Sequence, residues 1–204
     1  YERFLRELPD VEALAAVPED RLLKLWEGLG YYSRARNLKK AAIQIMDEFG
    51  GKFPETYDEI RSLQGVGSYT AGAVGSFVYG LPKAAVDGNV FRVVTRLLAD
   101  PDDITKAGTR KKIEDLIGEA IPRECPGDFN QGLIELGAII CLPNGAPKCG
   151  ECPLNSICRA CAQGTQLEFP VKKKAKARRV EKRTVFLFCD SSSVAIRKRP
   201  DEGL

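Results

Sequence analysis

Apolar residues recur at helical spacing, three and four positions apart, along most of the chain as far as residue 141. Gly50 and Gly51 interrupt this pattern, and Thr56 with Glu59 then forms a capping box that starts a new helix. The pattern predicts helices over residues 11–17, 21–29, 33–49, 56–63, 68–79, 89–98, 105–121 and 128–141. With short connections and no strand between them, these segments predict an all-α domain.

The pattern changes beyond residue 161. Residues 170–183 are rich in Lys and Arg and lack a period, which is typical of a linker. Residues 184–189 and 194–196 are rich in β-forming residues and flank a polar turn, so they predict a hairpin that opens a second domain. We therefore expect a helical core over residues 1–164, a basic linker over 165–182 and the start of a truncated domain over 183–204. The chain begins without Met, and we expect both ends to be truncations.

Composition and charge narrow the class of protein. The 204 residues are 44% hydrophobic and 29% charged, as in an ordinary globular protein, and no apolar run approaches the roughly 20 residues that span a bilayer. We expect no membrane partner. Residues 172–183 hold eight basic residues and one acidic residue, which leaves 23 basic against 27 acidic residues elsewhere. Any affinity of the core for nucleic acid must therefore come from local placement of cations and backbone amides.

Five of the seven cysteines lie within residues 141–161. The odd total, the clustering and the lack of a signal peptide argue against a disulfide framework and favour metal binding in a reducing compartment. Cys141, Cys149, Cys152 and Cys158 are separated by seven, two and five residues. Zinc sites usually contain two Cys-x2-Cys pairs, and only the middle pair here has that spacing. An iron–sulfur cluster is therefore favoured, with a zinc loop or free thiols as alternatives. Cys161 is interpreted as a bystander.

A Gly-x-Gly turn joins the predicted helices 56–63 and 68–79. The turn and the first residues of the following helix are Gly65, Val66, Gly67, Ser68, Tyr69 and Thr70. Glycine permits positive φ and close approach to another chain, and the free amides at a helix N-terminus can bind phosphate. The turn thus predicts a contact to the DNA backbone, with an ordinary helix–helix connection as the alternative.

Asp87 lies 18 residues after Tyr69, at the start of the predicted helix 89–98. A helix N-cap is its ordinary role, and such a carboxylate stays ionised.

The turn, the Asp-Gly-Asn-Val stretch and the cysteine loop together resemble the helix-hairpin-helix superfamily of endonuclease III and, within it, the MutY-type adenine DNA glycosylases. The resemblance implies that Asp87 is the catalytic carboxylate, with Asn89 in the same site, and that the four cysteines hold a structural 4Fe-4S cluster. In the reaction that the resemblance implies, the sugar becomes cation-like as the N-glycosidic bond breaks, and an ionised carboxylate stabilises it. The base must first leave the stack. The first cysteine gap is one residue longer than the family's usual six. Tyr69 stands where endonuclease III-like enzymes have a Lys that attacks the sugar. Because Tyr cannot form an imine, the resemblance implies a monofunctional glycosylase.

Residues 25–38 are similar to the MutY segment that enters DNA at the lesion. The resemblance implies that Tyr31 wedges beside the base opposite the target, that Leu29 probes it and that Arg34 also contacts DNA. Packing within a loop is the alternative for these aromatic residues. Residues 184–198 resemble the beginning of the family's Nudix-like C-terminal domain, which recognises 8-oxoguanine.

These resemblances imply base-excision repair: hydrolysis of the N-glycosidic bond of adenine opposite 8-oxoguanine or guanine in double-stranded DNA. They imply a monomer acting in the bacterial cytoplasm. A thymine glycosylase for G·T mismatches and a non-catalytic iron–sulfur DNA-binding module are the alternatives. The family's general acid is a Glu in a helix that would precede Tyr1. We therefore expect the 204 residues alone to excise little or no adenine.

Overall fold

The computed structural model describes residues 1–173, 180–182 and 184–196. It divides into two units, Tyr1–Lys173 and Lys174–Leu204. The first unit therefore includes residues 165–173, the predicted start of the linker. No helix among the described residues is long and apolar enough to cross a membrane.

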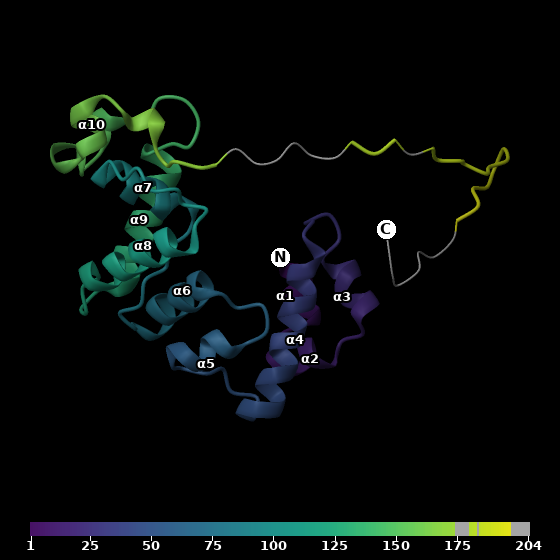
Figure 1. Cartoon of the computed structure of the whole chain (residues 1–204). Coiled ribbons are helices and arrows are strands. Elements are labelled where there is room, and N and C mark those ends of the chain that lie inside the picture. Colours follow the sequence, from purple (N-terminus) through teal and green to yellow (C-terminus); the bar gives the residue numbers. More distant parts are fainter. Residues whose placement is uncertain (174–179, 183, 197–204) are drawn as a thin grey trace. The chain divides into compact units, whose positions relative to one another are not determined.

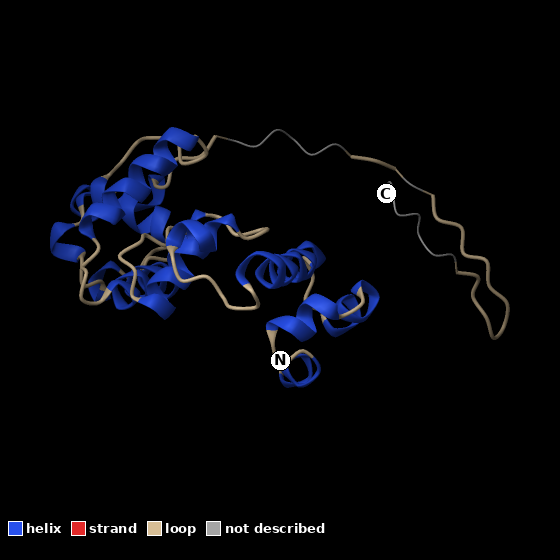
Figure 2. Ribbon diagram, turned by 90° about the horizontal axis from the view of Figure 1, so that it is seen from below, coloured by secondary structure: helices blue, strands red, loops and turns tan. Residues whose placement is uncertain are grey.

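The first unit is all-helical, which confirms the predicted fold class (Figures 1 and 2). Its α-helices are α1 (Glu2–Glu7), α2 (Val11–Ala16), α3 (Glu19–Leu25), α4 (Tyr32–Phe49), α5 (Tyr57–Ser62), α6 (Ser68–Tyr79), α7 (Gly88–Leu98), α8 (Ala107–Ala120), α9 (Pro126–Glu135) and α10 (Arg159–Gln163). Shorter turns are η1 (Leu136–Ile140), η2 (Cys149–Glu151), η3 (Asn155–Ile157) and η4 (Gln166–Glu168).

Most of the predicted helices form where the apolar period places them, and the capping box of Thr56 and Glu59 is present at the start of α5. Two predicted helices differ from the structure. The one expected over residues 21–29 ends at Leu25, because the following residues form the turn that carries Leu29. The one expected over 128–141 changes to a π-helical turn, η1, at Leu136. A π turn widens the helix by one residue and is often found at functional sites.

Helix α7 lies at the centre of the largest core. Its residues from Val90 to Arg96 are all buried, and it contacts α8, α9, α10 and η1. The apolar side chains of this core are Val86, Val90, Phe91, Val94, Ile104, Ile113 and Ile117. A second core, around Leu22 and Ala35, is formed by the first four helices. The position of α7 matters for function because Asp87 precedes it and the cysteines surround its other end.

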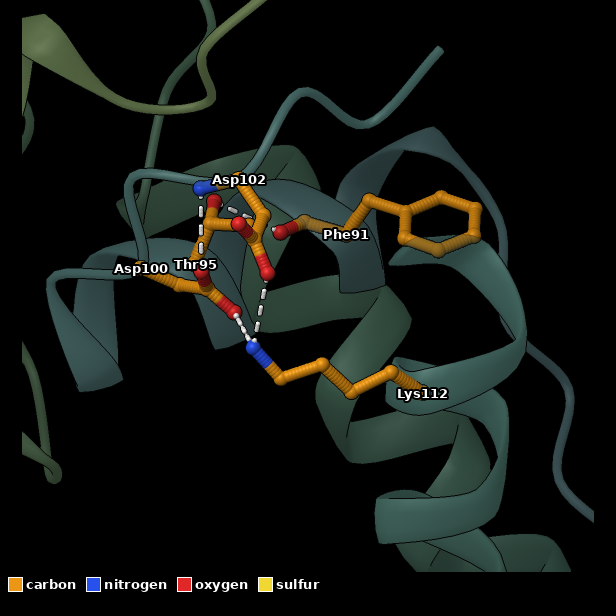
Figure 3. Close-up of polar contacts among 5 residues, drawn as sticks. All are labelled: Phe91, Thr95, Asp100, Asp102 and Lys112. Carbon is orange, nitrogen blue, oxygen red and sulfur yellow. Dashed lines mark hydrogen bonds and ion pairs between the residues drawn. The ribbon is translucent and has the colours of Figure 1, made fainter. Parts of the chain in front are cut away.

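The connection from α7 to α8 is held by charged side chains (Figure 3). The Lys112 ammonium on α8 donates to Asp100 Oδ2 at 2.9 Å and to Asp102 Oδ2 at 3.0 Å. Inside α7, the Thr95 hydroxyl donates to the carbonyl oxygen of Phe91 at 2.8 Å, so this buried hydroxyl is satisfied. The two contacts of Lys112 tie α8 to the segment that follows α7.

The second unit contains a tight turn. The Asp190 carboxylate accepts from the backbone N–H groups of Ser192 and Ser193, and Cys189 and Val194 form an isolated antiparallel bridge. No strand is formed by the described residues of this segment, so the expected hairpin is seen only at its turn. Assignment to a Nudix-like domain stays a prediction, and the part of it beyond residue 196 lies outside the described residues.

Candidate active site and metal centre

Asp87 is the N-cap of α7, and both of its carboxylate oxygens are held by neighbours in the chain. Oδ1 accepts from the backbone N–H groups of Asn89 at 2.8 Å and Val90 at 2.9 Å. Oδ2 accepts from the Asn89 side-chain amide at 2.9 Å. All three contacts use the carboxylate as an acceptor, which suits its ionised form. Asn89 is thus placed to orient the Asp87 carboxylate. The sequence predicts both residues for the same site.

Asp87 and Tyr69 line one cavity of about 420 Å³, a volume within the roughly 300–1,000 Å³ usual for small-molecule sites. The structure therefore brings together two residues that the sequence predicts for the same site. Burial, and to a lesser extent the negative charge of Asp87, raises the pKa of Tyr69, so its phenol is neutral at physiological pH. The other lining residues are Val86, Gly88, Phe91, Ile104, Thr105, Arg110 and Lys172.

Three of those lining residues are polar or charged, and the motifs did not indicate them: Thr105, Arg110 and Lys172. The backbone N–H of Ile104 donates to the carbonyl oxygen of Val171 at 3.1 Å, which fastens the end of the helical unit beside the cavity. Lys172 reaches the cavity because of this pairing. Its sequence context, a basic run, indicated only a linker.

The Gly-x-Gly turn forms a sharp connection between α5 and α6. Gly65 has φ +81°, and a Cβ there would lie 2.6 Å from the Cβ of Asn37 on α4, so only glycine fits. Gly67 is the N-cap of α6, and no side chain caps that N-terminus. The first amides of α6 are therefore available to an external acceptor such as phosphate. The Ser68 hydroxyl instead donates to Glu114 on α8 at 3.1 Å.

Close packing links this turn to the Asp87 cavity. A Cβ on Gly72 of α6 would clash with the backbone carbonyl oxygen of Ala84, so α6 lies directly against the segment that leads to Asp87. Asn130 of α9 holds the same segment. It is fully buried; its Oδ1 accepts from the Ala85 N–H at 3.0 Å, and its Nδ2 donates to the Lys83 carbonyl oxygen at 2.9 Å.

The loop before α4 presents apolar side chains to solvent. Leu29 and Tyr31 are 63% and 78% exposed. The Trp26 indole N–H donates to the Gly30 carbonyl oxygen at 3.0 Å, and the Arg34 guanidinium lies 5.0 Å from the centre of the Tyr31 ring. Tyr31 takes φ +48°, a strained conformation for a residue with a side chain. A braced loop with exposed aliphatic and aromatic side chains suits insertion between bases.

The four predicted cysteine ligands line one cavity at the C-terminal half of α7. They are Cys141, Cys149, Cys152 and Cys158, and their thiols are all free. Cys161, interpreted from the sequence as a bystander, lines the same cavity. The reason is that Cys158 immediately precedes α10 and Cys161 lies three residues later, so both occupy one face of that helix.

The donor set of this cavity suits a metal centre. Its lining contains the four cysteines together with Cys161. Thiolates are the ligands of structural zinc ions and of the irons of iron–sulfur clusters, so the residues present fit an iron–sulfur cluster.

Two buried arginines of α7, which the motifs did not indicate, connect the cysteine loop to the rest of the site. Arg96 is 3% exposed; its Nη1 lies 3.2 Å from Cys141 Sγ and donates to the Leu142 carbonyl oxygen at 2.9 Å. Its charge can stabilise an anionic thiolate group. In the sequence, Arg92 and Arg96 stand out only as two cations four residues apart on a helix whose other core-facing residues are mostly apolar.

The second of these arginines, Arg92, reaches Asp87 through Asn89. Its Nε donates to the Cys141 carbonyl oxygen at 2.7 Å, and its Nη2 donates to Asn89 Oδ1 at 2.9 Å. Gly137 of η1 permits this arrangement, since a Cβ there would lie 2.5 Å from the Cβ of Asn89. One set of hydrogen bonds therefore runs from the cysteine loop to the candidate catalytic carboxylate.

These features define a helix-hairpin-helix protein with a carboxylate cavity and a cysteine centre at the two ends of one helix. Residues 1–119 match the model of the HhH-GPD superfamily of base excision DNA repair proteins, and the chain belongs to that family.

Relatives and solved structures agree with this assignment. The chain is 40% identical over 161 residues to the adenine DNA glycosylase of Rattus norvegicus, which covers 78% of this chain and 31% of that protein. It is 39% identical over 180 residues to that of Buchnera aphidicola subsp. Baizongia pistaciae (strain Bp), with 86% and 49% covered. The chain thus spans less than half the length of these relatives.

Two solved structures share the fold. A thermostable thymine-DNA glycosylase superposes with a TM-score of 0.72 and 29% identity, covering 80% of this chain and 75% of that one. A non-covalent endonuclease III–DNA complex superposes with a TM-score of 0.68 and 30% identity, covering 81% and 75%.

Proposed function

We propose that this chain carries the catalytic core of a monofunctional adenine DNA glycosylase that removes adenine opposite 8-oxoguanine or guanine in double-stranded DNA. The observation that carries the proposal is the Asp87 carboxylate, held through both oxygens in a cavity that it shares with Tyr69. The adenine DNA glycosylases at about 40% identity favour adenine as the base. The protein acts as a monomer on chromosomal DNA in the bacterial cytoplasm.

Asp87 stabilises the sugar cation that forms as the N-glycosidic bond breaks, and it directs water to the sugar carbon. Asn89 keeps the carboxylate in one orientation, so little reorganisation is needed as charge develops. Tyr69 is neutral and lacks an amine, so the sugar is released to water and the strand is left uncut. The mixed apolar and polar lining of the cavity suits a base taken out of the stack.

The amides at the start of α6 bind a phosphate of the DNA, while Leu29 and Tyr31 enter the stack beside the lesion. The Arg34 guanidinium supports Tyr31 by lying over the face of its ring. None of these contacts reads the base sequence, which agrees with a search for damage in any sequence context.

Cys141, Cys149, Cys152 and Cys158 would hold a 4Fe-4S cluster. When bound, the cluster supplies a covalent cross-link among segments that would otherwise be joined only by weak contacts. Two arginines connect this centre to the rest of the site. Arg96 compensates the negative charge of the cysteine thiolates. Arg92 joins the Cys141 carbonyl oxygen to Asn89 through hydrogen bonds.

A thymine glycosylase for G·T mismatches is the second candidate, because a thymine-DNA glycosylase has the higher TM-score of the two structures compared above. The full-length protein should be incubated with duplexes containing adenine opposite 8-oxoguanine, adenine opposite guanine, and G·T. Release of adenine without strand cleavage, and without a borohydride-trapped adduct, is expected. Release of thymine alone supports the second candidate, and binding with no base release supports a non-catalytic module.

A further inference from the structure

The cysteine centre contains five thiols, one more than a 4Fe-4S cluster requires, and they divide into two groups. Cys141, Cys152 and Cys158 also line a second cavity, which we call the inner cavity because buried apolar residues such as Val93 and Leu136 bound it. Cys149 and Cys161 line the first cavity, which we call the outer cavity, and not the inner one. Three thiols are therefore shared between the two cavities, and two thiols line the outer cavity without the inner one.

The two outer thiols come from different segments of the chain, Cys149 from η2 and Cys161 from α10, and they line the same small cavity. The Cys161 thiol donates to the side-chain oxygen of Asn155 at 3.1 Å, and Asn155 lines the outer cavity too. The Cys161 thiol is thus held at the outer cavity, which Cys149 also lines.

We propose that Cys161 is a reserve ligand of the cluster, able to bind the iron that Cys149 binds when Cys149 is lost. This inference rests on the proposed 4Fe-4S cluster and adds a residue outside the family's four-cysteine spacing. The exchange needs no oxidant or reductant. The Cys161 thiol releases its proton to water, and its thiolate forms one Fe–S bond at the iron that lacks the Cys149 thiolate.

The chain offers a matched set of variants to test this role in the full-length protein: C149A, C161A, the double variant C149A/C161A, and C141A. Alanine is chosen because, unlike serine, it offers no atom to iron. Iron per protein and absorbance at about 400 nm report the cluster. Far-UV circular dichroism reports folding, and neither readout depends on glycosylase activity.

We expect C161A to keep the wild-type iron content. C149A should stay within about two-fold of wild type, because one cysteine thiolate replaces another, whereas C149A/C161A should lose at least about ten-fold. C141A should lose its iron although Cys161 is present, since Cys161 does not line the inner cavity. Alkylation of native protein gives a second measurement: Cys161 should be modified in wild type and protected in C149A.

The role of Cys161 is overturned if C149A falls to the iron content of the double variant, whether or not it folds, or if the double variant keeps as much iron as C149A. It is also overturned if Cys161 is alkylated equally in wild type and in iron-loaded C149A. A wild-type protein without iron would overturn the cluster itself, and that result is distinct because it appears before any variant is made.

Discussion

The two ends of helix α7 carry the two centres of this protein, and they are built in different ways. At its N-terminus, Asp87 is held by Asn89 and Val90, two and three residues away in the chain. At its C-terminal half, Arg96 contacts Cys141 and the Phe169 carbonyl oxygen, 45 and 73 residues away. The carboxylate is thus positioned by local hydrogen bonds, whereas the cysteine centre exists only when distant segments have assembled.

This difference separates the effects of substitution at the two ends. A change in Asp87 that preserves its capping role should affect chemistry and leave the fold intact. A change near the cysteines should affect stability first, because it removes contacts that join distant segments.

The largest effect is expected for Asp87→Asn in the full-length protein. Asn retains the helix cap but lacks the negative charge, so single-turnover release of adenine should fall by at least about 10²–10³-fold. Affinity for the duplex and the melting temperature should change little. Asp58→Asn, in the exposed first turn of α5, is the control. Persistent adenine release by the variant would refute the role given to Asp87.

Arg96→Met tests the other end of α7. The substitution removes a buried cation and leaves the Leu142 and Phe169 carbonyl oxygens without their donor, so the free energy of unfolding should fall by about 3 kcal/mol. Urea denaturation of the iron-loaded protein measures the loss. Arg61→Met on exposed α5 should cost less than about 0.5 kcal/mol. Equal losses in the two variants would show that Arg96 has no special role.

Asn130→Leu tests whether the segment before Asp87 depends on a distant support. Leu has a similar volume but leaves the Ala85 N–H and the Lys83 carbonyl oxygen unpaired, and we expect a loss of about 1–3 kcal/mol in unfolding free energy. The side chain of its neighbour Gln131 is exposed and donates to Glu135 on the same helix, so Gln131→Leu is the matched control. A neutral Asn130→Leu variant would mean that the segment is held by α6 alone.

The smallest effect concerns the ionisation of Tyr69. Its pKa is raised by burial and, second, by the charge of Asp87, so the folded protein holds the phenolic proton above the ordinary value of about 10. The contribution of this proton to the free energy of unfolding is fully present below about pH 10, and it is lost as the pH rises through the pKa of the folded protein. In Asp87→Asn the pKa should fall but stay raised. Ultraviolet titration against Tyr69→Phe measures it, and an unchanged value would argue that the two side chains do not interact.

Several features of the site could be predicted from the sequence because they depend on contacts within a few residues. The helical period located α4 to α7, the capping box located the start of α5, and Gly65 marked the sharp turn. The N-cap role of Asp87 follows from its place before Gly88 and Asn89. These are local preferences of backbone and side chain, and the tertiary structure did not override them.

The tertiary structure alone decided which distant residues meet these local elements. It placed Asn130 against the segment before Asp87, Lys172 at the Asp87 cavity, and Cys161 at the cavity lined by the other four cysteines. In the sequence these residues are an amide on a helix, a cation in a basic run and a surplus cysteine. Their partners are chosen by the packing of α6, α7, α9 and α10. That packing depends on how complementary surfaces fill space, which no short-range pattern in the chain encodes.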